Sequence, residues 1–88
     1  MTYTVVLLKE QDGRYSVLVP SLKGCATWGE TLPEALRMAA EAIAAHLEGL
    51  EQRGLPIPAD CETVTFEMGD ATEAAVYRVT VEGVTAVA

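Results

Sequence analysis

Residues 20–50 read PSLKGCATWGETLPEALRMAAEAIAAHLEGL and contain the only long helical pattern in this chain. Thr31 and Glu34 have the spacing of a capping box, in which the hydroxyl accepts a free amide of the first turn and the carboxylate reaches back to the amide of the cap residue. Pro33 fits the first turn because no intrahelical hydrogen bond is lost there. These signals predict a helix that begins at residue 32.

Apolar residues then recur at steps of three and four, which places them on one side of a helix. They are Leu32, Leu36, Ala39, Ile43, Leu47 and Leu50. The pattern stops at Arg53 and Gly54, and Pro56 and Pro58 prevent a restart. We therefore expect a helix over residues 32–53, about 33 Å long, whose apolar side needs a second layer to cover it.

Strand patterns flank this helix. Residues 2–9 and 14–19 alternate and are rich in β-branched and aromatic residues, and Asp12-Gly13 between them favours a hairpin turn. Residues 25–28 could add a short third strand, and residues 75–82 read as a clear last strand. Because residues 2–9 are apolar on both faces, we expect them in the middle of the sheet.

The predicted fold class is therefore α+β, with the element order β-β-β-α-β in one domain over residues 1–88. A small antiparallel sheet would pack one face against the helix. Residues 63–68 alternate more weakly and leave two arrangements open. They could form a hairpin with the last strand, or the last strand could pair beside the first and leave residues 63–68 as a covering loop or an edge.

The composition describes an acidic globular chain. Its 88 residues are 50% hydrophobic and carry a formal net charge of −7. Such a surface repels nucleic-acid phosphates and anionic lipids and either attracts a basic protein or simply keeps the chain soluble. No apolar run approaches the roughly 20 residues needed to cross a bilayer, and Met1 leads directly into a strand pattern, so a cytoplasmic location is expected.

Catalytic or metal-binding patterns are weak. Cys25 and Cys61 are isolated and are interpreted as small apolar groups. His46 is the only histidine, without an identifiable nucleophile or second ligand. Glutamates recur at intervals of seven residues, at Glu34, Glu41 and Glu48, as is typical of a solvated helix face. We expect no enzyme activity, no metal and no cofactor, with a residual metal-dependent nuclease as the minor alternative.

A series of small and turn-forming residues surrounds the helix in fixed order. It comprises Pro20, Gly24, Cys25, Gly29, Thr31, Glu34, Ala35, Ala39, Glu41, Ala42, Gly54, Pro56 and Pro58. In this order and spacing the chain resembles the HicB family of antitoxins over about residues 3–58. The resemblance implies a domain similar to a degenerate ribonuclease H-like fold without that enzyme's activity. It also implies binding and neutralisation of a HicA-type toxin, a small basic messenger-RNA interferase, within a type II toxin–antitoxin system.

Most members of that family continue, after the last strand, into a helix-turn-helix or ribbon-helix-helix segment that binds operator DNA. Only residues 82–88 remain here, and the basic side chains are scattered along the sequence. We therefore expect an N-terminal HicB-like domain that does not bind DNA in its own right.

We expect four residues to contact a toxin. Glu10, Asp12 and Glu30 would imitate the phosphates that the toxin normally holds, and Trp28 is a candidate anchor, unless it covers the end of the core. Strand edges and the alanine-rich helix also favour self-association as a dimer or tetramer. The alternative function is an orphan oligomeric interaction domain without a toxin partner.

Overall fold

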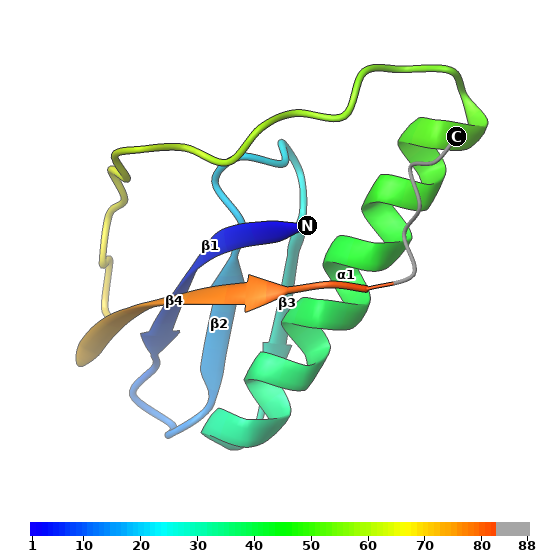
Figure 1. Ribbon diagram of the computed structural model, residues 1–88. Coiled ribbons are helices and arrows are strands. Elements are labelled where there is room, and N and C mark those ends of the chain that lie inside the picture. Colours follow the sequence, from blue (N-terminus) through cyan, green and yellow to red (C-terminus); the bar gives the residue numbers. More distant parts are fainter. Residues whose placement is uncertain (83–88) are drawn as a thin grey trace.

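Four strands and one helix make up the described part of the chain, residues 1–82, in this computed structural model. The elements are β1 (Thr2–Lys9), β2 (Tyr15–Leu18), β3 (Ala26–Gly29), α1 (Leu32–Gln52) and β4 (Glu73–Thr80). The strands form one antiparallel sheet in the order β3-β2-β1-β4, and α1 packs along one face (Figure 1). The predicted α+β class and element order are confirmed.

β1 lies inside the sheet because both of its faces are apolar. It pairs with β2 from Val6 opposite Leu18, and with β4 over its whole length. Tyr3, Val5 and Leu7 belong to the core beneath α1. Val6 and Leu8 are also buried but lie outside that core cluster, as alternation along a strand requires. The sheet is therefore covered on both faces near β1.

The helix buries a stripe of Ala35, Ala39, Ile43 and Leu47, spaced four residues apart. Leu32, Leu36 and Leu50 of the predicted stripe flank it and are half-buried. The stripe is centred on alanine because α1 approaches β3 closely. A Cβ atom built on Gly29 would lie 2.5 Å from the backbone nitrogen of Ala35. Small residues on both elements are what allow this contact.

Both ends of α1 are capped by side chains. The Thr31 hydroxyl accepts the Glu34 amide at 3.2 Å, as predicted. The Glu34 carboxylate accepts a hydrogen bond from the amide of Glu30 at 2.6 Å. The second bond of the capping box therefore reaches the residue before the cap, and not the amide of Thr31 as expected. At the other end the Arg53 guanidinium donates to the Gly49 carbonyl, and Gly54 turns the chain with a φ of 67°.

The α1–β4 loop, residues 53–72, crosses the end of the sheet and then runs along the face opposite α1 (Figure 1). Within residues 1–82, residues 63–68 form no strand, so the hairpin arrangement is wrong and the covering-loop arrangement holds. The last strand pairs beside the first. It begins at Glu73, two residues before the predicted start, because the register places Glu73 opposite Lys9 at the end of β1.

Residues 83–88, predicted to follow the last strand as a short tail, lie outside the described residues. Over residues 1–82, no helix combines the length and apolar character needed to cross a membrane.

Candidate functional site

A shallow hollow lies where the β1–β2 turn meets β3. Its lining consists of Glu10, Asp12, Arg14, Tyr15, Ser16, Thr27 and Trp28. Three of the four residues predicted to contact a partner, Glu10, Asp12 and Trp28, are thus brought together. Glu30 lies outside this lining, one residue beyond β3. We refer to this lining as the hairpin hollow.

Trp28 is displayed on the face of the sheet that points away from α1. It pairs with Ser16, whereas its neighbour Gly29 faces the helix. The side chain is 52% exposed, so the interpretation that it covers the end of the core is wrong. The Arg14 guanidinium carbon lies 5.3 Å from the centroid of the indole ring, a cation–π contact that holds the ring in place.

Asp12 is bound to the same arginine. Its carboxylate pairs with the Arg14 guanidinium at 2.9 Å and accepts the Arg14 amide at 3.0 Å. The hydrogen bond from the Arg14 amide, and then the one from its side chain, lower the pKa of Asp12. This carboxyl group is therefore ionised at neutral pH. The hollow therefore offers a row of carboxylate, guanidinium and indole rather than carboxylates alone. Sequence analysis missed Arg14 as a member of this site.

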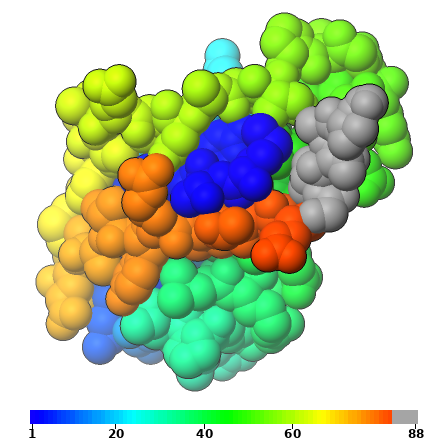
Figure 2. Space-filling view, in the orientation of Figure 1, coloured from blue at the N-terminus to red at the C-terminus, as the bar shows by residue number. Residues whose placement is uncertain are grey.

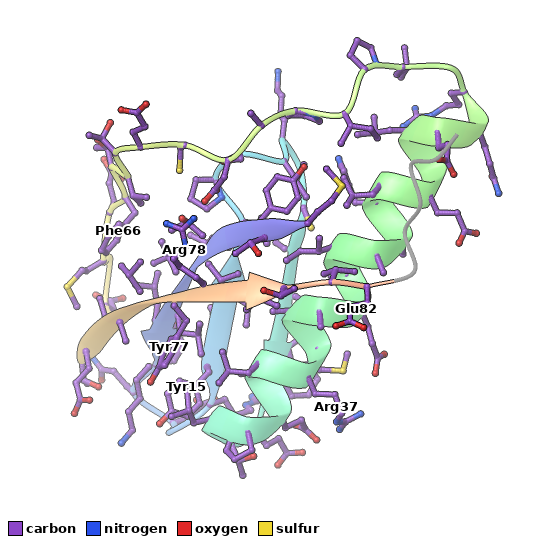
Figure 3. The ribbon with its side chains drawn as sticks, viewed as in Figure 1. Tyr15, Arg37, Phe66, Tyr77, Arg78 and Glu82 are labelled. Carbon is purple, nitrogen blue, oxygen red and sulfur yellow. The ribbon has the colours of Figure 1, made fainter. Side chains whose placement is uncertain are left out.

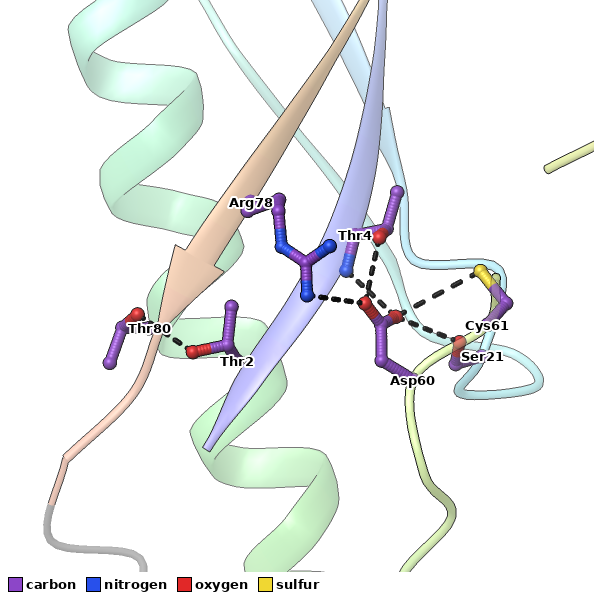
Figure 4. A network of polar contacts seen from close by, with 7 residues as sticks. All are labelled: Thr2, Thr4, Ser21, Asp60, Cys61, Arg78 and Thr80. Atoms are coloured by element: carbon purple, nitrogen blue, oxygen red, sulfur yellow. Dashed lines mark hydrogen bonds and ion pairs between the residues drawn. The ribbon is translucent and has the colours of Figure 1, made fainter. Parts of the chain in front are cut away.

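A second polar cluster surrounds Asp60 and fixes the α1–β4 loop (Figure 4). Its carboxylate accepts the Thr4 amide at 2.9 Å, the Thr4 hydroxyl at 2.8 Å and the Ser21 hydroxyl at 3.1 Å. Arg78 of β4 lies 3.6 Å away. The register that pairs Val6 with Leu18 would place Thr4 opposite Pro20, where β2 has ended. Asp60 supplies the acceptor that β2 no longer provides.

Hydrogen bonding determines the charge state of Asp60. Burial alone would raise its pKa, but the bonds from Thr4, Cys61 and Ser21 outweigh burial, and the pKa lies below its ordinary value. Tyr3 closes the same region by donating its hydroxyl to the Pro58 carbonyl. Burial, and then the charge of Asp60, raise the pKa of Tyr3, so the hydroxyl stays protonated and able to donate.

Replacing Asp60 with alanine is expected to lower the free energy of unfolding by about 2 kcal/mol at pH 7, because the buried Thr4 amide loses its acceptor. Since the folded pKa is lowered, this stabilisation is complete above the unfolded pKa of about 4 and is lost as the pH falls through the folded pKa. Urea unfolding of both proteins between pH 2 and pH 7 measures the difference. Glu62→Ala, an exposed neighbour, should cost less than about 0.5 kcal/mol at any pH; an equal loss in both variants would contradict the role of Asp60.

The remaining reactive side chains do not gather into a site. Cys25 is buried, and burial raises the pKa of its thiol, while Cys61 is half-buried beside Asp60; both are free. Among residues 1–82, no three His, Cys, Asp or Glu side chains lie where they could hold a metal ion together.

Comparison with known proteins supplies the context for these surfaces. The family model described as HicB-like antitoxin of bacterial toxin–antitoxin systems matches residues 3–85. A UPF0150 protein of Thermoplasma acidophilum is 48% identical over 60 residues, covering 68% of this chain and 87% of that protein.

Two solved structures extend the comparison to the fold. The N-terminal domain of antitoxin HicB from Burkholderia pseudomallei is 29% identical with a TM-score of 0.73, covering 93% of this chain and 99% of that domain. A chain of a toxin–antitoxin complex from Streptococcus pneumoniae has a TM-score of 0.75 at 20% identity, covering 93% of this chain and 69% of its own. The last likeness is one of fold alone.

Proposed function

This chain belongs to the HicB-like antitoxin family, and on that premise we propose that it is an antitoxin that binds a HicA-type toxin and neutralises it by protein–protein contact. The observation that carries this proposal is the family match over residues 3–85. The chain would act without catalysis, by covering the surface with which the toxin cleaves RNA. Its place of action would be the cytoplasm, where that RNA is translated.

The hairpin hollow has the chemistry that such contact needs. A half-exposed indole is a strong anchor, because burying it on association removes a large apolar surface from water. Glu10 and Asp12 beside it offer carboxylates to side chains that otherwise hold phosphate. Glu30 would add a further carboxylate outside the hollow. The net charge of −7 would speed the encounter with a basic toxin by long-range attraction.

We also propose that the chain self-associates as a dimer or tetramer. Several large apolar side chains are exposed, including Met1, Leu55 and Met68 at 44%, 46% and 39%. A small domain buries a limited share of its surface alone, so contact between copies would add to its stability.

Light scattering of the chain, alone and mixed with a HicA-type toxin, tests both proposals. Alone, the chain should scatter as a multiple of 9.4 kDa at micromolar concentration. With the toxin it should form a stable complex, and the association rate should fall about tenfold or more between 50 mM and 500 mM salt. Absence of a complex at low salt would refute the antitoxin role, and a single 9.4 kDa species would refute self-association.

A further inference from the structure

The outer edge of β4 carries backbone groups that no strand pairs with in residues 1–82, because β4 ends the sheet. Met1 and Val81 exchange backbone hydrogen bonds at 3.1 and 2.8 Å. Because hydrogen-bonded pairs alternate along an antiparallel ladder, the odd-numbered residues of β4 bond to β1. The amides and carbonyls of Ala74, Val76, Arg78 and Thr80 therefore point outward. Figure 2 shows β4, in orange, lying open between the α1–β4 loop and α1.

Within residues 1–82, this edge lacks most of the usual protection against pairing. Soluble proteins block long edges with lysine, proline, bulges or short strands. β4 has eight residues in unbroken register with β1, and its sequence EAAVYRVT contains neither lysine nor proline. Its one basic side chain, Arg78, is held over the face of the sheet by Asp60. By contrast, the opposite edge, β3, has four residues and packs against α1.

A groove beside the edge indicates what the incoming side chains would be. It lies between β4 and the α1–β4 loop. Its lining includes the apolar Val64 and Val76, the acidic Asp60 and Glu62, and the basic Arg78. Val76 is 53% exposed. Figure 3 shows Phe66 on the same loop, on the side of the sheet away from α1. Alternate side chains of an added strand would enter this groove, while the others would lie on the α1 side near Tyr77 and Val79.

The charge of this region selects between possible occupants. Residues 54–78 contain one basic side chain, Arg78, which pairs with Asp60, and five carboxylates: Asp60, Glu62, Glu67, Asp70 and Glu73. A second copy pairing β4 with β4 would bring the same acidic loop against the groove. A strand carrying lysine or arginine would meet opposite charge there. The observations thus favour a strand of a basic protein over a strand of this chain.

We propose that the outer edge of β4 receives an unpaired β-strand of the basic toxin, which extends the sheet to five strands. This inference rests on the proposed antitoxin function and assigns it a second contact surface besides the hairpin hollow. Backbone hydrogen bonds from Ala74, Val76, Arg78 and Thr80 would hold the strand, and Val64 and Val76 would receive its apolar side chains. Glu62 would meet its basic ones.

Amide hydrogen exchange of the unmodified protein, free and with the toxin, tests the proposal without a variant. The amides of Ala74, Val76, Arg78 and Thr80 should exchange about tenfold or more slowly in the complex, because they gain partners there. Slowing that appears with rising concentration of the chain alone would show that a second copy occupies the edge, and would overturn the proposal.

Val76→Pro supplies the matched functional test. Proline removes an outward amide and leaves the ladder with β1 intact, since its missing donor faces solvent. Toxin affinity should fall about tenfold or more, whereas Val76→Ala, which keeps the amide, should change it less than about threefold. Thermal unfolding must show both variants folded, and if the proline variant is not folded the exchange measurement alone decides.

Glu62→Lys tests the electrostatic attraction separately from the backbone hydrogen bonds. Affinity should fall severalfold at low salt and recover at high salt, where charges are screened. A toxin that binds normally while the four edge amides exchange at their free rates would overturn this inference and leave the antitoxin function standing. Failure of the unmodified chain to bind any toxin would refute both.

Discussion

Replacing Gly29 with alanine is expected to lower the free energy of unfolding by about 3 kcal/mol. A methyl group at this position would lie 2.5 Å from the Ala35 nitrogen and 2.6 Å from its Cα atom. Both are backbone atoms of the first turns of α1, so no side chain can rotate away to make room. The helix would have to move off β3, and the buried contacts along Ala35 and Ala39 would loosen.

Gly49→Ala is the matched control in urea unfolding. Gly49 lies within α1, and a Cβ atom there would meet nothing within 4 Å. Alanine is the better helix former, so this variant should gain about 0.5 to 1 kcal/mol. Opposite signs for the two substitutions are the expected result. A Gly29→Ala protein as stable as the unmodified chain would contradict the close packing of α1 on β3.

Replacing Trp28 with alanine is expected to weaken toxin binding about 30-fold, which corresponds to about 2 kcal/mol. The indole is 52% exposed in the free chain and is held by Arg14, so it is available to a partner at little cost in side-chain order. Stability should change little, because the ring lies on the face away from the core beneath α1. Affinity is measured by calorimetry, and stability by urea unfolding.

Leu55→Ala is the control for that experiment. Leu55 is 46% exposed and lies in the α1–β4 loop, outside the lining of the hairpin hollow. Its replacement should leave toxin affinity within about twofold, since Leu55 lies outside both surfaces proposed to contact the toxin. Equal losses in both variants would indicate a general effect of surface hydrophobicity and would remove Trp28 from the interface.

The helix and the order of the elements could be predicted from the sequence because their signals are local. Thr31, Pro33 and Gly54 mark the ends of α1 whatever surrounds it, and four-residue spacing defines its buried side. The interior position of β1 followed from its two apolar faces. What these signals could not give was the exact centre of the helix stripe, which depends on the close contact between Gly29 and Ala35.

The conformation of the α1–β4 loop could not be predicted from local sequence patterns. Val64, Phe66 and Met68 alternate like a strand, but pairing is decided by which segment reaches the edge of β1, and β4 reaches it with eight residues. Asp60 was missed for a related reason. It lies in a proline-containing connection without periodicity, and its partner Thr4 is 56 residues away in sequence.

The hairpin hollow itself was not predicted, although three of its residues were named as candidates for contact with a partner. The Asp12-Gly13 pair predicted the turn, and with it the position of Glu10 and Asp12. The structure adds that the antiparallel register of β2 and β3 brings Trp28 beside them. The contribution of Arg14 depends on two contacts at once, with Asp12 and with the indole. Neither contact leaves a spacing in the sequence by which it could be recognised. Whether these residues bind a toxin stays a prediction.

Titration of RNA cleavage tests the central claim most directly. The purified toxin is mixed with increasing amounts of this chain, and the rate of cleavage of a fluorescent RNA is followed. We predict that cleavage falls linearly and stops at a fixed stoichiometric ratio, and that Trp28→Ala shifts the curve to higher concentration. Cleavage that continues undiminished at a tenfold excess of the folded chain would contradict the antitoxin function.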